Sequence, residues 1–388
     1  VAVVDTDGTW SGTAGTVLEA FQYLSQASDS KKSDGQSNYY KEVINRTSKY
    51  VYWTGHPAAL TDCGESLAGQ ASATAYVTGT DKIESAMAGG TDDNVPTTGE
   101  IGTGFDLLAD AETIDVNLLF AYPDANGSKD IADKLIAICN ARKDCMAFVS
   151  PPIEDSVGTS TPAADVKAWA DTLPSTSYAA TDSGAVYVYD KYNDVYRWLG
   201  AAGLCAGLCA NTDDVADAWF SPAGVNRGQL FGVTKLAYNP KKADRDTLYK
   251  ARVNPLVSFP GQGTMLFGDK TLLSKPSAFD RINVRRLFIV LEKAVATAAK
   301  AQLFEFNDEF TRAQFRNMLE PFMRDVKGRR GMTDFRVICD TTNNTGQVID
   351  ANRFVADIFI KPSRSINFIT LNFIATRTGV DFSEIAGS

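Results

Sequence analysis

The chain has 388 residues, of which 44% are hydrophobic and 22% are charged. These fractions are typical of folded soluble domains and exclude a disordered, collagen-like or coiled-coil protein, and the length predicts two or three domains. Forty-seven acidic and 38 basic side chains give a net charge of −9, which argues against nonspecific binding to nucleic acid or to an anionic membrane. No stretch of about 18 uncharged apolar residues occurs, so we expect no membrane-spanning helix.

The beginning of the sequence predicts a fragment of a longer protein. Val1 opens directly on a strand-like segment, without an initiator Met and without a basic leader or cleavage pattern. We therefore expect that the N-terminal region of the complete protein is missing here.

The residue types that usually carry catalysis and metal binding are scarce or dispersed. The six cysteines form no CxxC pair, and His56, in a turn-like Thr-Gly-His-Pro setting, is the single histidine. Cys205 and Cys209 share one helix face and are expected to be free thiols that pack in a core. We predict no catalytic residue, no metal site and no cofactor.

One segment has the glycine spacing of a phosphate-binding loop. Gly263 and Gly268 are spaced as in a Walker A motif, but the extra residue Asp269 moves Lys270 away from the position that contacts the β- and γ-phosphates. We therefore expect no nucleotide site at this segment.

Residues 1–105 mix short apolar patterns with polar, turn-rich stretches, and we assign them to part of a middle or outer domain. The expected elements are a strand at 1–4, a helical face carrying Val17, Leu18, Phe21 and Leu24, a helix at 39–45, a strand at 50–53 and a surface loop at 89–104.

Residues 106–220 have the alternating pattern of an α/β domain. The apolar runs at 116–122 and 145–149 predict strands that are covered on both faces. A helix capped by Ser128 and a helix with Pro162 in its first turn follow them. This order predicts right-handed crossovers and a partly parallel sheet. Residues 185–189 and 195–198 predict a hairpin.

Residues 221–388 predict an α+β domain with long helices and a strand-rich end. The expected elements are a helix within 239–253, a tight turn at 259–263, a long Ala-rich helix that carries Leu287 to Ala298, a helix opened by a capping box at 311–314, and strands at 335–339, 354–360 and 366–375. Pro321 lies inside the second long helix and is expected to kink or split it.

Two basic clusters stand out in this acidic chain, Arg285 with Arg286 and the run at 327–330. Either could bind phosphate, and a charged contact with another protein is at least as good an explanation.

Four motifs in the second half of the chain resemble a known family. They are SPAGVNRG at 221–228, NPLVSFPGQG at 254–263, FDRINVRRL at 279–287 and the C-terminal run at 355–379, which contains LNFIATRTG. In this order they resemble the contractile tail sheath proteins of tailed bacteriophages, and of T-even-type phages in particular. The resemblance is specific from about residue 185 onward and looser before it.

The resemblance implies a structural subunit and not an enzyme. Such subunits polymerise helically as stacked rings around a tail tube, and the sheath contracts by rearrangement of its subunits to drive the tube through the host envelope. The implied partners are further copies of the chain, the tail tube protein, and the baseplate and tail terminator proteins. The implied location is the virion tail, after assembly in the bacterial cytoplasm. The inner C-terminal domain would face the tube.

The last apolar strand has hydrophobic side chains of both parities. Ile366 and Phe368 share one parity, whereas Ile369, Leu371 and Phe373 share the other. A central strand of the chain's own domain and a strand that pairs with a neighbour's sheet edge both fit this pattern. For the tail beyond Thr376 we favour the intersubunit role. The candidate contact residues are Arg285, Arg286, Phe368, Leu371, Phe373 and Arg377.

Two alternatives remain open at this point. A related contractile device, the sheath of a bacteriocin or of a secretion machine, could use the same inner domain. An α/β hydrolase or nucleotide-binding enzyme could use the loops that follow the strands, where Asp124 is the available carboxylate.

Overall fold

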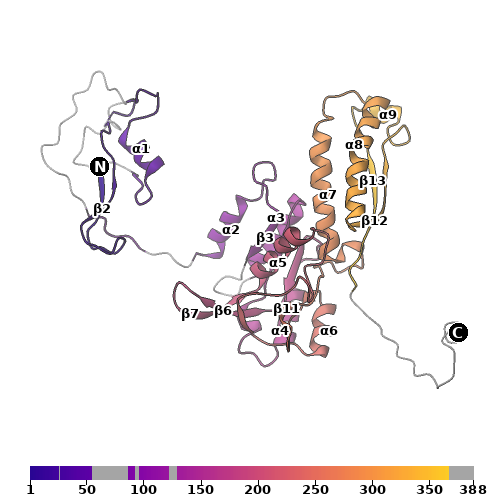
Figure 1. Ribbon diagram of the computed structural model, residues 1–388, viewed down its shortest axis with the longest axis horizontal. Helices are drawn as coiled ribbons and strands as arrows, with labels where there is room; N and C mark the ends of the chain where they lie inside the picture. The colour runs from indigo at the N-terminus through magenta and orange to yellow at the C-terminus, as the bar shows by residue number, and fades with distance from the viewer. Residues whose placement is uncertain (26, 55–85, 92–95, 122–128, 367–388) are drawn as a thin grey trace. The chain divides into compact units, whose positions relative to one another are not determined.

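The computed structural model describes residues 1–25, 27–54, 86–91, 96–121 and 129–366 (Figure 1). The chain divides into two units, Val1–Asp92 and Asp93–Ser388. The threefold division at residues 105 and 220 stays a prediction. None of the described helices is long and apolar enough to cross a membrane.

The first unit contains an antiparallel pair of strands, β1 (Ala2–Asp5) and β2 (Thr16–Ala20). The predicted strand at the N-terminus is confirmed, but the helix predicted from Val17 onward is wrong. The Asp5 carboxylate accepts hydrogen bonds from the backbone N–H groups of Trp10 and Ser11 and closes the connection between the strands. This turn returns residues 16–20 alongside β1, where pairing satisfies their backbone groups and the β-branched side chains fit.

Helix α1 (Tyr40–Thr47) confirms the helix predicted near residue 39. The strand predicted at 50–53 is wrong, because this segment joins no sheet in the structure. The side chain of Asn45 holds it instead, donating to the Trp53 carbonyl at 3.0 Å and accepting from the Trp53 N–H at 2.6 Å. Val51 and Trp53 thereby pack against the buried Tyr40 and Ile44 of α1.

The second unit is built on a parallel sheet with the strand order β3-β4-β5-β9, which confirms the predicted α/β class. The strands are β3 (Leu118–Ala121), β4 (Met146–Val149), β5 (Ala179–Asp182) and β9 (Val253–Asn254). The last of these comes from beyond residue 220, so the sheet takes strands from both sides of that position.

Helices cover both faces of this sheet. They are α2 (Thr98–Asp106), α3 (Asp130–Arg142), α4 (Pro162–Asp171), α5 (Ala202–Val215) and α6 (Lys242–Lys250), with a 3₁₀ turn at Ile153–Asp155. Strand β4 shows that the sheet lies between two layers of helices. Met146 and Phe148 pack in the core that includes α5, whereas Ala147 and Val149 pack in the core that includes α3. Because β4 is buried on both faces, its sequence is a continuous apolar run.

Two helix starts differ from the sequence predictions. Part of the loop expected at 89–104 is helix α2, which begins after a capping box between Thr97 and Glu100. Helix α3 follows Lys129, which makes no side-chain cap, and Ser128 lies outside the described residues.

Antiparallel strands follow the parallel sheet. Strands β6 (Ala185–Asp190), β7 (Val195–Gly200) and β8 (Val233–Leu236) form a sheet with the order β7-β6-β8. Strands β10 (Leu256–Phe259) and β11 (Gly263–Leu266) form a separate hairpin. The hairpin predicted from 185–189 and 195–198 and the tight turn predicted at 259–263 are confirmed.

The C-terminal part consists of a long helical hairpin and a two-stranded sheet. After a 3₁₀ turn at Ala278–Asp280, its elements are α7 (Ile282–Lys300), α8 (Glu309–Gly328), β12 (Met332–Ile338), α9 (Gly346–Asp350) and β13 (Asp357–Pro362). Helices α7 and α8 run side by side, and the antiparallel β12 and β13 lie along α8 (Figure 1).

Three predictions for this part are corrected by the structure. Helix α8 is not split but continues through Pro321, since its two sides are fixed by packing of Phe315, Leu319, Met323 and Val326. Its N-cap is Asp308, which accepts from the Thr311 N–H at 2.8 Å, so Thr311 lies in the first turn and not at the cap. Strand β13 begins at Asp357 instead of residue 354.

Candidate functional site

The carboxyl edge of the parallel sheet is where α/β folds usually place their active sites, and the buried Asp182 ends β5 there. Its Oδ2 accepts a hydrogen bond from Ser150 Oγ at 2.5 Å, and its Oδ1 accepts from the Gly184 N–H at 2.9 Å. Ser150 Oγ accepts in turn from the N–H of Ala202, the first residue of α5, at 2.8 Å. The carboxylate therefore links the ends of β4 and β5 to the starts of α5 and β6.

Burial raises the pKa of Asp182 to about 7, although the hydrogen bonds from Ser150 and Gly184 partly counteract this effect. Removal of a carboxyl group from water disfavours its charged form. A carboxyl group that titrates near neutral pH suits general acid–base catalysis only if it lies within reach of a substrate.

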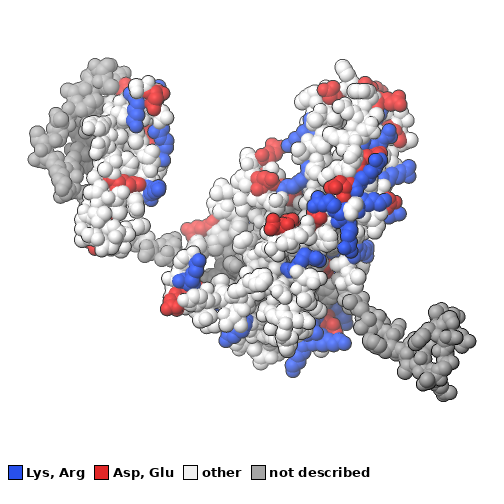
Figure 2. Space-filling view, in the orientation of Figure 1, with Lys and Arg blue, Asp and Glu red and all other residues white. Residues whose placement is uncertain are grey.

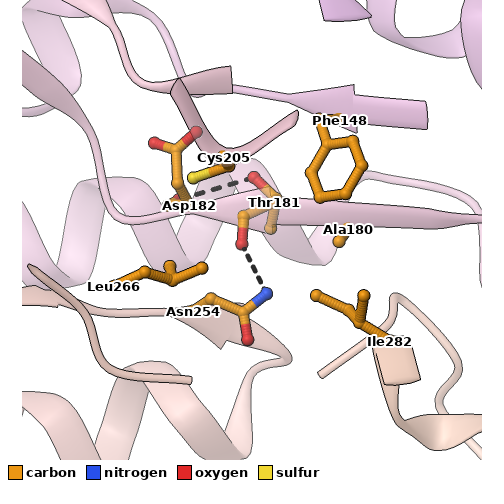
Figure 3. Close-up of a pocket in the computed structure, with 8 residues that line it drawn as sticks. All are labelled: Phe148, Ala180, Thr181, Asp182, Cys205, Asn254, Leu266 and Ile282. Carbon is orange, nitrogen blue, oxygen red and sulfur yellow. Dashed lines mark hydrogen bonds between the residues drawn. The ribbon is translucent and has the colours of Figure 1, made fainter. Parts of the chain in front are cut away.

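The space beside Asp182 is too small to admit a substrate. The cavity has a volume of about 10 Å³, roughly the room for one water, whereas ligand pockets usually exceed about 300 Å³. It is lined by Phe148, Ala180, Thr181, Asp182, Cys205, Asn254, Leu266 and Ile282 (Figure 3).

The polar groups around this cavity bind one another. The Asn254 amide donates to the Thr181 carbonyl at 3.0 Å, as Figure 3 shows, and to the Lys270 carbonyl at 2.8 Å. Its oxygen accepts from the Lys270 N–H at 2.7 Å. The ends of β5 and β9 are therefore crosslinked to each other and to the segment that carries Lys270. The sequence alternative of an enzyme relied on Asp124, which lies outside the described residues.

Arg285 is placed inside the fold. Its side chain is 7% exposed, and its Nε and Nη2 donate to Ser177 Oγ at 3.0 and 2.6 Å. The guanidinium stacks between the rings of Tyr178 and Phe279, 4.2 and 4.1 Å from their centroids, and burial lowers its pKa. Arg285 therefore joins α7 to the start of β5.

Arg286 is also buried, at 5% exposure. It donates from Nη2 to Asp213 Oδ2 at 2.5 Å and from Nη1 to the Cys209 carbonyl at 3.3 Å, which ties α7 to α5. Contact of Arg285 or Arg286 with a neighbour or a tube stays untested. Reversing both charges would break hydrogen bonds within one chain, so we expect it to destabilise the monomer itself.

The other candidate contact residues, Phe368, Leu371, Phe373 and Arg377, lie outside the described residues. The chain that leads to them is anchored. Ser365 Oγ donates to the buried Asp269 at 2.6 Å, and the Ser363 N–H donates to the Gly331 carbonyl at 3.2 Å. Ile366 is 82% exposed.

Sequence reasoning missed two exposed aromatic surfaces. The aromatic sheet face comprises Tyr187 and Tyr189 of β6, Tyr196 and Trp198 of β7, and Lys235 of β8, with ring centroids 4.7 to 5.4 Å apart between neighbours. The apolar tip comprises the exposed Leu303, Phe304 and Phe306 of the α7–α8 connection and the exposed Phe310 in the first turn of α8. The alternation of aromatic residues along the predicted hairpin could have revealed the aromatic sheet face. Finding the apolar tip required knowledge of where α7 ends.

Charge is divided unevenly along the chain. Residues 282–366 contain 14 Lys and Arg, of which Arg285, Arg286 and Arg312 are buried, against 10 Asp and Glu, whereas the remaining residues contain 24 against 37. Figure 2 shows the basic side chains gathered along the outer side of α8, β12 and β13. We call this surface the basic face, and its exposed basic side chains are Arg324, Lys327, Arg329, Arg330, Arg336 and Lys361. It offers an acidic partner a complementary surface.

Family models match most of the second unit. The model described as the phage tail sheath protein central domain matches residues 99–272, and the phage tail sheath C-terminal domain matches residues 274–376. Together they cover well over half of the chain.

Curated relatives agree with these matches. Tail sheath protein of Vibrio phage KVP40 is 48% identical over 73% of this chain and 45% of its own length, and that of Enterobacteria phage T4 is 44% identical over 78% and 48%. Tail sheath protein of Salmonella phage ViI is 38% identical over 96% and 55%. The chain thus spans about half the length of these relatives.

Solved structures share the fold. The sheath complex of the extracellular contractile injection system PVC, in its contracted state, has a TM-score of 0.59 at 21% identity and covers 70% of this chain and 73% of its own. The contracted helical sheath of the anti-feeding prophage has a TM-score of 0.58 at 19% identity and covers 74% and 76%. With the two domain matches and identities of 38–48% to named sheath proteins, the chain belongs to the phage tail sheath family.

Proposed function

We propose that this chain is the inner and middle part of a contractile tail sheath subunit of a T-even-type bacteriophage. Copies of the complete subunit would polymerise as stacked helical rings around the tail tube. On a baseplate signal the sheath would contract and drive the tube through the host envelope. The observation that carries the proposal is the 38–48% identity to tail sheath proteins of three phages across 73–96% of the chain.

The contacts of α7 support a mechanism in which subunits move without unfolding. Arg285 and Arg286 tie this helix to β5 and α5, and Lys293 Nζ binds Asp115 Oδ1 and Asn117 Oδ1, just before β3, at 2.5 and 2.7 Å. The C-terminal helices and the parallel sheet would therefore move together, and contraction would change the contacts between subunits. Nucleotide hydrolysis has no part in this mechanism.

The basic face supports contact with an acidic partner, which we propose to be the tail tube surface. Positive charge on this side would guide assembly around the tube and weaken at high salt. The sheath ends would meet the baseplate and the tail terminator proteins. The subunit would assemble in the bacterial cytoplasm and reside in the virion tail.

The C-terminal residues are proposed to link subunits. Among the described residues, β12 and β13 pair only with each other, and the edge of such a sheet can pair with an added strand. Phe368, Leu371, Phe373 and Arg377 would lie in such a linking segment. Pairing of residues 366–375 within their own domain remains the alternative.

A related contractile device is the second candidate, favoured by one observation. The similar solved structures named above belong to an extracellular contractile injection system and to the anti-feeding prophage. Their identity to this chain, about one fifth, is far below that of the phage relatives. We therefore place the phage sheath first.

Electron microscopy of the complete subunit, produced together with its tube and baseplate proteins, tests the proposal. We expect sheathed tails that shorten and widen when treated with mild denaturant, without added nucleotide. Particles that carry a baseplate and sheath but no head would favour the related device. Soluble particles that never form a sheath would contradict both, and contraction that requires nucleotide would contradict the mechanism.

A further inference from the structure

The apolar tip exposes large hydrophobic side chains that the described residues leave uncovered. Leu303, Phe304, Phe306 and Phe310 are 63%, 105%, 84% and 75% exposed. Residues 303–310 also contain three acidic residues and no Lys or Arg. Such a cluster on a folded domain indicates an interaction site. Because the cluster is acidic as well as aromatic, we expect a basic, apolar partner surface.

The connection that carries the tip is held in place. The buried Arg312 donates from Nη1 to the Asn307 Oδ1 at 2.8 Å, and the Asn307 amide donates to the Arg353 carbonyl at 2.8 Å. Phe304 has a φ of 71°, a left-handed conformation that is unfavourable for a bulky residue. The aromatic rings are therefore presented to solvent by a fixed backbone, which lowers the entropic cost of binding.

A surface of the opposite character lies around the β10–β11 hairpin, and we call it the basic aromatic patch. Phe231 and Phe267 are 80% and 45% exposed. The guanidinium of Arg245 lies 5.6 Å from the ring of Phe259 and 6.0 Å from that of Phe267. The Leu230 N–H donates to the Thr264 carbonyl at 2.9 Å, which places Phe231 beside this hairpin.

The charge of the patch complements that of the tip. The segments 221–232, 241–250 and 255–268 contain five Lys and Arg against two Asp. Figure 2 shows basic side chains along the end of the second unit that carries α6. The α7–α8 connection lies at the other end of that unit (Figure 1). Within one copy the two surfaces therefore cannot meet.

We propose that the apolar tip of one copy docks on the basic aromatic patch of the next copy. The inference rests on the proposed function, because a sheath needs contacts that repeat along a polymer. Two different surfaces at opposite ends make a heterologous contact, which extends in one direction instead of closing into a dimer. The Phe rings would provide the buried anchors, while Glu305 and Glu309 would face the Arg and Lys side chains of the patch.

Two variants of the full 388-residue chain test this contact. The tip variant carries Phe304→Ser and Phe306→Ser, and the patch variant carries Phe231→Ser and Phe267→Ser. Sedimentation velocity measures association of each variant alone and of their mixture. We expect each variant alone to self-associate at least about 100-fold more weakly than the wild type. Their mixture should form a 1:1 complex, because one still has an intact patch and the other an intact tip.

Several outcomes would overturn the contact. They are a wild-type chain that stays monomeric, a variant that associates like the wild type, and a mixture that remains monomeric. A tip variant that fails only to bind the tail tube would reassign the tip to that partner and also refute the contact. Should either Ser variant lose its cooperative thermal transition, the exposed pair Glu305→Lys and Glu309→Lys replaces the tip variant, and Arg245→Glu replaces the patch variant.

The contact and the sheath proposal can fail separately. A 1:1 complex in the mixture, with no sheath from the complete subunit in the electron microscope, would uphold the contact and refute the sheath. A sheath that forms normally from subunits carrying the tip substitutions would uphold the sheath and refute the contact.

Discussion

The carboxyl edge of the parallel sheet and the apolar tip depart from the usual distribution of side chains in opposite ways. At the sheet edge a carboxylate is buried, and at the tip several aromatic rings are exposed. Asp182 finds its partners in Ser150 and Gly184 of the same chain. The rings of Phe304 and Phe306 find no cover among the described residues. Buried polar groups thus report how a single copy is stabilised, whereas exposed apolar groups report where copies or partners meet.

Charge reversal at the buried Arg286 should give the largest effect. Arg286→Glu would leave a carboxylate at a buried position, facing the exposed Asp213 and the Cys209 carbonyl. We expect a loss of about 5 kcal/mol in the free energy of unfolding or complete failure to fold, because the buried charge has no partner. Urea denaturation followed by circular dichroism measures it. Arg324→Glu, at an exposed position of α8, is the matched control and should change stability by less than about 1 kcal/mol. Equal effects at the two sites would refute the buried role.

Two phenylalanines near the same helical hairpin provide the next contrast. Phe315 is 2% exposed and Phe304 is 105% exposed. We expect Phe315→Ala to lower the free energy of unfolding by about 3–5 kcal/mol through loss of core packing. Phe304→Ala should change it by less than about 0.5 kcal/mol. Differential scanning calorimetry of the two variants compares them directly. A large loss for Phe304→Ala would mean that the tip serves the fold of one copy.

Asp182 should make stability depend on pH in a defined window. Its folded pKa of about 7 exceeds its ordinary value of 3.8, so the folded protein binds one more proton than the unfolded chain between these values. The stabilisation from this group is therefore fully present below about pH 4 and is lost as the pH rises to about 7. Asp182→Asn cannot titrate, so the difference in stability between wild type and variant should change with pH only in this window.

At a fixed pH, Asp182→Asn should lower stability by less than Arg286→Glu or Phe315→Ala. We expect Asp182→Asn to cost about 1–3 kcal/mol at pH 5, because the hydrogen bond from Ser150 or Gly184 loses its best acceptor. Chemical denaturation between pH 4 and 8 measures both effects. A difference that stays constant across this range would show that Asp182 does not titrate there.

Local patterns predicted much of the second unit and failed where spacing was ambiguous. The apolar run of β4 and the polar turn between β6 and β7 have one reasonable interpretation each. Val17, Leu18, Phe21 and Leu24 have a helical spacing, but residues 16–20 pair with β1 because the turn closed by Asp5 brings them there. Helix α8 continues through Pro321 because core packing outweighs one lost hydrogen bond.

The candidate contact residues Arg285 and Arg286 also show that sequence patterns do not reveal burial. Adjacent arginines usually lie on the surface, and their sequence contains no sign that Arg285 and Arg286 are buried. Their partners Ser177 and Asp213 lie 108 and 73 residues away in the chain. The sequence shows the hydrophobic residues of the apolar tip but not that they are exposed, because their exposure depends on where α7 ends and α8 begins.

The sequence by itself determined the family resemblance, the α/β and α+β character and most strands of the second unit, because these depend on order and spacing along the chain. Only the tertiary structure decided which charges are buried, that the space beside Asp182 has no room for a substrate, and that the apolar tip and the basic aromatic patch lie at opposite ends of one unit. The physical reason is that burial and charge complementarity are properties of neighbours in space, and most of those neighbours are distant in sequence.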